Sequence, residues 1–204
     1  MIDVTTQDRL RVLTIDRQEK ANSLTREMLV ALASQVEEAA VDPAIQALVL
    51  TGRGKVFSAG ADLEAARAGL ATDGVWERLS GAIADAPILT IAALNGTAAG
   101  GALGMVLACD LRVSVPGAKI FYPVMKLGFL PQPSDPERLA ALVGPARAKL
   151  ILMAGQKIPA DEALAMGLLD RLADNPVDAA RALAADALAA KRSHVAAIKE
   201  MIDD

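Results

Sequence analysis

Two glycine-bearing segments hold the residues whose type and spacing could do chemistry. Residues 57–62 read FSAGAD and follow an apolar run at 47–51, and residues 95–101 read NGTAAGG and follow an apolar run at 88–92. A strand, a glycine turn and then a helix is an order that exposes backbone amides, which attract negative charge. A ligand oxygen can approach the main chain closely where there is no side chain, at Gly60, Gly100 and Gly101. The sequence predicts that both turns converge on one oxygen.

Alternating strands and helices must position these turns. Residues 2–6 and 10–16 are expected to form a hairpin, and Thr25 is expected to cap a helix that ends at Asp42-Pro43. The further strands expected are 47–51, 88–94, 111–115 and 118–121. The further helices expected are 73–85, 102–108, 135–143, 146–153, 161–166, 177–190 and 195–202. This order predicts an α/β layered domain with a helical C-terminal part.

Composition and charge narrow the class of protein. The 204 residues are 53% apolar but only 2% aromatic, so the core must be packed from small aliphatic side chains, as in helices that lie on sheets. The formal net charge of −4 argues against a nucleic-acid surface, which needs clustered Lys and Arg. We expect one domain over residues 1–204, with a core at about 1–172 and C-terminal helices at about 175–204.

Cysteine use and the N-terminus indicate the cytoplasm. Cys109 is the only cysteine and cannot form an internal disulfide, and Asp3 stands where a secretory leader would be basic and then apolar. The uncharged stretch 86–109 is long enough to cross a membrane. Pro87, Asn95 and several glycines divide it, which favours a strand, a turn and a buried helix and argues against a membrane partner.

The two glycine segments resemble the signature of the crotonase family, the enoyl-CoA hydratase/isomerase superfamily. Other segments that carry the resemblance are KANSL at 20–24, CDLR at 109–112, Leu127-Gly128 followed by Pro131, and ALAMGL at 163–168. The resemblance implies the crotonase fold, a ClpP-like spiral of ββα units. It also implies an acyl-CoA thioester as substrate, with coenzyme A as part of that substrate and with no other cofactor and no metal.

The resemblance assigns roles to particular residues. It places the thioester carbonyl between the amides of Ala59 and Gly101, which would stabilise an enolate as it forms. Gly101 would also stand at the N-terminus of the buried helix at 102–108, where the helix dipole adds to the stabilisation of negative charge. Asp62 is expected to hold its turn. The residues expected to contact the substrate are Lys20 and Ala21 beside the adenine and 3'-phosphate, and Ala59, Gly60, Ala61, Asp62, Gly100, Gly101 and Gln132.

Two glutamates of the family's hydratases are missing. Their positions hold Gly104 and Val124, and neither residue can move a proton, so hydration by the usual route is excluded. Many isomerase-like members place an acid directly after the proline that follows Leu-Gly. That residue is Gln132 here.

The nearest acids are Asp135 and Glu137, and Tyr122 is a further candidate for proton transfer. Ser134-Asp135-Pro136-Glu137 also fits a capping box, in which Glu137 returns to the amide of Ser134. Tyr122 beside Pro123 could instead serve only packing. Catalytic and structural roles both remain open for these three residues.

Other reactive residue types have structural interpretations. His194, the only histidine, is far in sequence from both turns, which argues against a hydrolase built on Ser58. Cys109 is expected to pack at a helix end with a raised pKa. Glu64, Arg67 and Trp76 are interpreted as solvated helix residues in a segment that, by resemblance, covers the acyl chain.

Family members usually continue well beyond a segment like 191–202, so the sequence resembles a short member. An apolar face left uncovered must be buried elsewhere, and a trimer or hexamer is therefore expected. The preferred function is enoyl-CoA isomerisation, because one base can move a proton between two carbons. The alternatives are an acyl-CoA decarboxylase or other lyase, and a subunit that binds acyl-CoA without turning it over.

Overall fold

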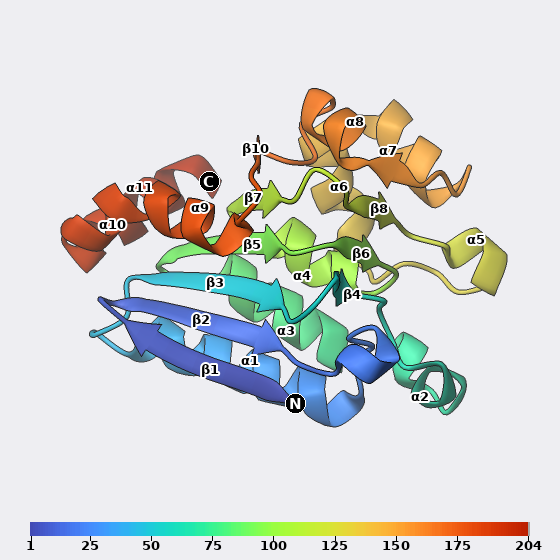
Figure 1. Cartoon of the computed structure of the whole chain (residues 1–204), viewed down its shortest axis with the longest axis horizontal. Coiled ribbons are helices and arrows are strands. Elements are labelled where there is room, and N and C mark those ends of the chain that lie inside the picture. Colours follow the sequence, from blue (N-terminus) through green and yellow to red (C-terminus); the bar gives the residue numbers. More distant parts are fainter. Residues whose placement is uncertain (204) are drawn as a thin grey trace.

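Two β-sheets of unequal size form the centre of the molecule in the computed structural model, which describes residues 1–203 (Figure 1). The larger sheet has six strands, of which only the first pair is antiparallel. In spatial order these strands are β1 (Ile2–Gln7), β2 (Leu10–Ile15), β3 (Ala47–Gly52), β5 (Leu89–Leu94), β7 (Leu111–Ser114) and β10 (Arg171–Leu172). The turn between β1 and β2 has positive φ at Asp8 and Arg9, which suits a two-residue hairpin.

A smaller four-stranded sheet lies beyond the carboxyl ends of the central strands. Its strands are β4 (Val56–Ser58), β6 (Thr97–Ala99), β8 (Lys119–Phe121) and β9 (Ile158–Pro159). The chain runs from the larger sheet into the smaller one three times, from β3 into β4, from β5 into β6 and from β7 into β8. This repetition makes a spiral and brings β4 and β6 side by side.

Helices cover both faces of the larger sheet because its strands alternate apolar side chains to either side. From β3, Leu48 and Leu50 join the larger core cluster with α1 (Arg26–Val41), α3 (Val75–Ala84) and α4 (Ala102–Ala108). Ala47 and Val49 point the other way and join a smaller cluster with α9 (Pro176–Leu183) and α10 (Ala185–Ala189). The last helix, α11 (Arg192–Asp203), is tied to the start of β7 by the Lys199–Asp110 ion pair at 2.9 Å.

The remaining helices surround the smaller sheet. They are α2 (Leu63–Arg67), α5 (Val124–Leu127), α6 (Asp135–Val143), α7 (Pro145–Leu152) and α8 (Ala160–Ala165), with 3-10 turns at Gln18–Lys20 and Leu70–Thr72. In Figure 1, α2 and α5 lie at the same end of the molecule as β4 and β6. That end therefore holds both glycine segments.

Most elements expected from the sequence are confirmed, including the hairpin and the Thr25 cap, whose hydroxyl accepts the Met28 amide. The expected single helix over 177–190 is wrong, because it is interrupted at Ala184 to give α9 and α10. The strands β4 and β6 were missed, since three residues are too few to show an alternating pattern. The uncharged stretch 86–109 becomes β5, β6 and α4, and no helix within residues 1–203 is long and apolar enough to cross a membrane.

Two asparagines fix the connection between β3 and β4. The buried Asn22 side chain donates to the carbonyls of Arg53 at 2.9 Å and Val56 at 2.7 Å. Asn95 accepts the Gly52 amide at 2.9 Å and donates to the Gly54 carbonyl at 2.9 Å. The entry into β4 is thereby tied to the end of β5, which sets the separation of the two glycine segments.

Candidate active site

The two glycine turns meet in direct backbone contact. A Cβ atom at Gly60 would lie 2.7 Å from the Ala99 carbonyl oxygen and 3.2 Å from the Gly101 nitrogen. Gly60 also has a φ of +90°, a conformation that side chains rarely adopt. Only glycine fits at position 60 without displacing the second turn.

An unpartnered amide follows each of two left-handed glycines. Gly60 precedes Ala61, and Gly100, with a φ of +58°, precedes Gly101. The Gly100 amide pairs with the Phe121 carbonyl at 3.1 Å, which continues the ladder between β6 and β8. Within residues 1–203, neither the Ala61 amide nor the Gly101 amide has a hydrogen-bond acceptor, and both residues line the same cavity. Two such donors can bind one anionic oxygen.

The expectation for Ala59 is wrong. Its amide donates to the Ala21 carbonyl at 3.0 Å and is not available to a ligand. The amide of Gly60 is also occupied, by the Ser58 hydroxyl at 3.2 Å. The available donor is two residues further on, at Ala61. The sequence signal for it is the parallel between Gly60-Ala61 and Gly100-Gly101, in which the donor follows the turn glycine.

Asp62 holds the turn, as expected. Its carboxylate accepts the amides of Glu64 and Ala65 as the N-cap of α2, and it pairs with Arg17 at 2.9 Å. The Ala65 amide and the Arg17 guanidinium lower the pKa of the Asp62 carboxyl. Asp62 therefore stays ionised and fixes the segment that presents the Ala61 amide.

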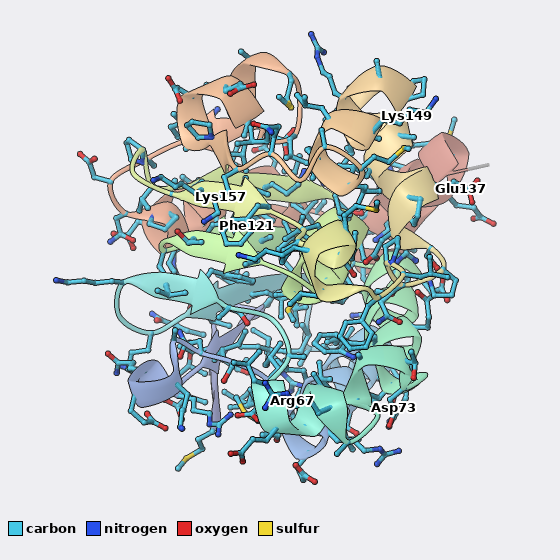
Figure 2. The ribbon with its side chains drawn as sticks, turned by 90° about the vertical axis from the view of Figure 1, so that its right-hand side faces the viewer. Arg67, Asp73, Phe121, Glu137, Lys149 and Lys157 are labelled. Atoms are coloured by element: carbon cyan, nitrogen blue, oxygen red, sulfur yellow. The ribbon has the colours of Figure 1, made fainter. Side chains whose placement is uncertain are left out.

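The cavity that the two amides share has a volume of about 310 Å³. Its lining is mostly apolar, from Ala59, Ala61, Leu63, Ala66, Ala71, Trp76, Gly100, Gly101, Pro123, Val124, Leu127, Phe129 and Leu130, with Tyr122, Gln132 and Arg67. Arg67, on α2, is the only charged residue among them and is labelled on the near face in Figure 2. The cavity suits an apolar chain of modest size whose polar end meets the amides.

Trp76 belongs to this cavity and is not the solvated residue that the sequence suggested. Its side chain is buried, and its ring lies against Gly101, where a Cβ atom would be 3.1 Å from Cη2. The indole N–H donates to the Leu70 carbonyl at 2.7 Å. The indole therefore forms a fixed wall beside the Gly101 amide. Arg67 and Glu64 are exposed, as expected.

An open groove continues from the cavity past Lys20. It shares Ala59, Ala61, Leu63 and Arg67 with the cavity and is also lined by the cationic side chains of Arg17, Lys20 and Arg26. Ala21 lies on a different hollow, with Gln18 and Arg53. Of the two residues expected beside the nucleotide, only Lys20 lines the groove that leads to the amides.

Tyr122 links the cavity to a buried carboxyl group. Its hydroxyl donates to Oδ2 of Asp135 at 2.9 Å and accepts the Gln132 amide at 3.4 Å. Tyr122 lines the cavity, whereas Asp135 is fully buried behind it. Oδ1 of Asp135 has no hydrogen-bond partner within residues 1–203. The pair places a proton donor at the cavity wall with a proton acceptor behind it.

Burial dominates the titration of this pair. Desolvation raises the pKa of Asp135 to about 6, the Tyr122 hydrogen bond lowers it and the nearby charge of Glu77 raises it. Burial and the Asp135 charge raise the pKa of Tyr122, so the phenol keeps its proton. Asp135 is consequently the group of the pair that changes charge in the ordinary working range of pH.

The capping-box interpretation is wrong. Ser134 makes no side-chain cap bond to α6, and its amide and hydroxyl both bond to the Glu77 carboxylate of α3. Glu137 is exposed, does not line the cavity and lies away from Arg67 in Figure 2, so its expected catalytic role is also wrong. Of the two acids considered, Asp135 is the one that the fold buries beside the site.

The positions of the missing glutamates are both at the site. Val124 lines the cavity. A Cβ atom at Gly104 would lie 3.0 Å from Oδ1 of Asp135, so the carboxyl group fills the space beside this glycine. Gln132 lines the cavity too, but its side-chain amide donates to the Ala71 carbonyl at 3.0 Å.

The hydrolase alternative is excluded by position. The Ser58 hydroxyl is buried and donates to the Asn22 carbonyl at 2.7 Å, while His194 lies on α11 beside a separate hollow. Cys109 is buried at the end of α4, and desolvation raises the pKa of its thiol to about 12, as expected. Ser58, Cys109 and His194 therefore do not form a catalytic group at this site.

Comparisons with known proteins identify the family. The family described as enoyl-CoA hydratase/isomerase matches residues 5–204. The "Probable enoyl-CoA hydratase EchA14" of Mycobacterium tuberculosis is 38% identical over 194 residues, which are 92% of this chain and 75% of that protein. The crotonyl-CoA hydratase of Syntrophomonas wolfei is 36% identical over 176 residues, which are 81% of this chain and 66% of that protein.

The fold agrees with this family. The crystal structure of an enoyl-CoA hydratase/isomerase from Pseudoalteromonas atlantica superposes with a TM-score of 0.89 and 32% identity, over 98% of this chain and 82% of that one. The spiral of two sheets is thus the crotonase fold. The chain belongs to the enoyl-CoA hydratase/isomerase family.

The contact between the two turns predicts that Gly60→Ala is more damaging than an ordinary glycine substitution. We expect it to lower the free energy of unfolding by about 2–4 kcal/mol, because backbone strain adds to the collision with Ala99 and Gly101. Gly155→Ala is the matched control, since Gly155 has a φ of +65° but open space around it; its expected cost is about 1 kcal/mol. Urea unfolding measures both, and equal costs would contradict the contact.

The buried Asp135 predicts a pH-dependent stability. Its raised pKa means that the folded chain binds more protons than the unfolded chain between about pH 4 and pH 6, so the free energy of unfolding falls as pH rises through that window. Asp135→Asn removes this penalty and should stabilise the protein above pH 6 by up to about 3 kcal/mol, with no gain near pH 4. Thermal unfolding from pH 4 to 8 tests this, and parallel profiles for the two proteins would refute it.

Proposed function

We propose that this protein binds acyl-CoA thioesters and stabilises their enolates between the backbone amides of Ala61 and Gly101. The observation that carries the proposal is that these two unpartnered amides line one apolar cavity. Formation of an enolate puts negative charge on the thioester oxygen, and a preorganised donor for such an oxygen contributes about 2.7–4 kcal/mol. The contact at Gly60 holds the donors in place before any substrate arrives.

The groove past Lys20 supports the choice of substrate. Coenzyme A carries phosphates, and the groove that continues from the cavity is lined by the cationic side chains of Lys20, Arg17 and Arg26. The acids Glu27, Asp62 and Glu64 line the same groove. Arg17 is paired with Asp62 and Arg26 with Asp73, so Lys20 is the cation best able to meet a phosphate. Coenzyme A enters as part of the substrate, and the proposed reaction uses no further cofactor.

Tyr122 and Asp135 supply the proton transfer. In the isomerisation of a 3-enoyl-CoA, the phenol oxygen takes a proton from C2 as its own proton passes to the Asp135 carboxylate, and the electron pair of the C–H bond moves into the dienolate. The reverse transfer delivers one proton to C4, which gives the conjugated 2-enoyl-CoA and restores the pair. The two transfers are concerted through the phenol because its raised pKa disfavours a free phenolate.

Isomerisation is preferred over hydration on chemical grounds. Hydration by the family's usual route needs two carboxylates, one to activate water and one to protonate the substrate, and positions 104 and 124 hold Gly and Val. Asp135 fills the space beside Gly104 and gives one acid–base group. One such group is enough to move a proton between two carbons.

A second candidate function rests on Arg67. This guanidinium is the only charged group that lines the cavity, and within residues 1–203 it forms no ion pair. It could hold a carboxylate on the acyl group of a malonyl-type thioester, whose loss as CO2 leaves the enolate between the amides without a base. The third alternative is binding of acyl-CoA without turnover.

A panel of thioesters separates these functions. We expect the purified protein to convert 3-enoyl-CoA to 2-enoyl-CoA and, in D2O, to incorporate deuterium into the product, as followed by absorbance and mass spectrometry. Release of CO2 from malonyl-type thioesters would establish the lyase instead. Binding of every thioester with neither product formation nor deuterium incorporation would leave only the binding role.

The amide donor predicts the effect of Ala61→Pro. This substitution removes an N–H that makes no internal bond, so we expect turnover to fall at least about a hundredfold while the protein still binds CoA. Calorimetric titration with CoA and circular dichroism provide the control for folding. Unchanged turnover in a folded variant would remove Ala61 from the proposed site.

A further inference from the structure

Two consecutive residues of α3 contact both halves of the proposed site. Trp76 lies against Gly101, which presents one of the two amides. Its neighbour Glu77 reaches the segment that carries Asp135. A single helix therefore contacts the amide donor on one side and the start of the acid's helix on the other.

The contact at Glu77 is bidentate. Oε1 accepts the Ser134 amide at 3.2 Å, and Oε2 accepts the Ser134 hydroxyl. Ser134 directly precedes α6, and Asp135 is the first residue of that helix. The Glu77 carboxylate thus accepts the amide of the N-cap residue Ser134, the bond that Glu137 would accept in a capping box. The orientation of Asp135 toward Tyr122 depends on where this helix begins.

We propose that Glu77 is a positioning residue, which fixes Asp135 against Tyr122 through its bonds to Ser134 and brings a carboxylate charge close to that pair. The inference rests on the proposed function, because it assigns Glu77 to the acid–base pair of that reaction. Glu77 does not line the cavity, so it acts through Asp135 and is not expected to touch the substrate.

Few charged groups surround Asp135, so the effect of the Glu77 charge on the pKa of Asp135 can be separated from the effects of the others. Tyr122 faces the carboxyl group from the segment after β8, Glu77 acts from α3, and Arg138 lies on the same helix. From α4 the neighbour is the uncharged Gly104. Burial and Glu77 raise the pKa of Asp135, whereas the Tyr122 hydrogen bond and Arg138 lower it. Removal of the Glu77 charge should therefore let Asp135 lose its proton at a lower pH.

The deciding variant is Glu77→Gln, which removes the charge but keeps an oxygen that can accept from Ser134. We expect the acid limb of kcat/KM against pH to move down by about 0.5–1 pH unit. Glu77→Ala, which also removes the link to Ser134, should lower kcat with little change in KM. The matched control is Glu162→Gln on the exposed surface of α8, which changes the net charge equally and should leave the profile unchanged.

A second readout does not depend on turnover. The titration of Asp135 can be followed by 13C NMR of protein labelled at the aspartate carboxyl carbons, with the signal assigned by its loss in Asp135→Asn. The same downward shift in Glu77→Gln is expected there. If wild-type protein turns over no thioester, the proposed function fails while this titration still decides the role of Glu77. An Asp135 titration that is identical in wild type and Glu77→Gln would overturn the inference and leave Glu77 as a helix cap alone.

Discussion

The structure of the site depends on the backbone contact between Gly60 and the segment Ala99–Gly101. Two turns from different repeats of the spiral approach so closely that a Cβ atom at position 60 would lie 2.7 Å from the Ala99 carbonyl. This contact brings the amides of Ala61 and Gly101 to one cavity, although the two residues are 40 positions apart in the sequence. Hydrogen bonds of Asn22 and Asn95 hold the strands that lead into the turns, so the contact is imposed by the fold and does not wait for a ligand.

The two kinds of group in the site are specified differently by the sequence. The amide donors need only glycines at two turns and a fold that joins them. The acidic side chain is that of Asp135, which belongs to α6. Its carboxyl group occupies space that is free only because residue 104 of α4 is a glycine. The glycine at position 104 of α4 and the buried carboxyl group of Asp135 from α6 are therefore linked, because a side chain at position 104 would occupy the space of that carboxyl group.

The sequence predicts most of the fold for identifiable reasons. The helix at Arg26–Val41 has an apolar repeat and a threonine cap, and β3 and β5 are continuous apolar runs, so local pattern decides them. The strands β4 and β6 have three residues each, and pairing between distant segments defines them. No periodicity could have shown them.

The site is predicted less completely because its members are distinguished by tertiary contacts. Ala59 and Ala61 are the same residue type in the same motif, and only the bond from Ala59 to the Ala21 carbonyl separates them. Asp135 and Glu137 both fit a helix start, and they differ in tertiary surroundings, since Asp135 is buried against Tyr122 and Glu137 is exposed. The Ser134 bonds expected within this helix go to Glu77 of a distant helix. Glu77 itself has no local sequence signal.

The arrangement also limits the reactions that this site can perform. In the proposed function the amides stabilise charge on the thioester oxygen whatever group removes or delivers the proton. They therefore determine the class of intermediate and do not determine the product. The product depends on how many protons the surrounding side chains can accept or donate in one step. In the part of the chain that the structure describes, Asp135 is connected to the cavity only through the Tyr122 phenol. The hydroxyl of that phenol donates to Asp135 and accepts the Gln132 amide. Such a pair can exchange a single proton with a bound enolate, but it offers no second base to orient and deprotonate water. The isomerisation proposed above needs no more than this one exchange.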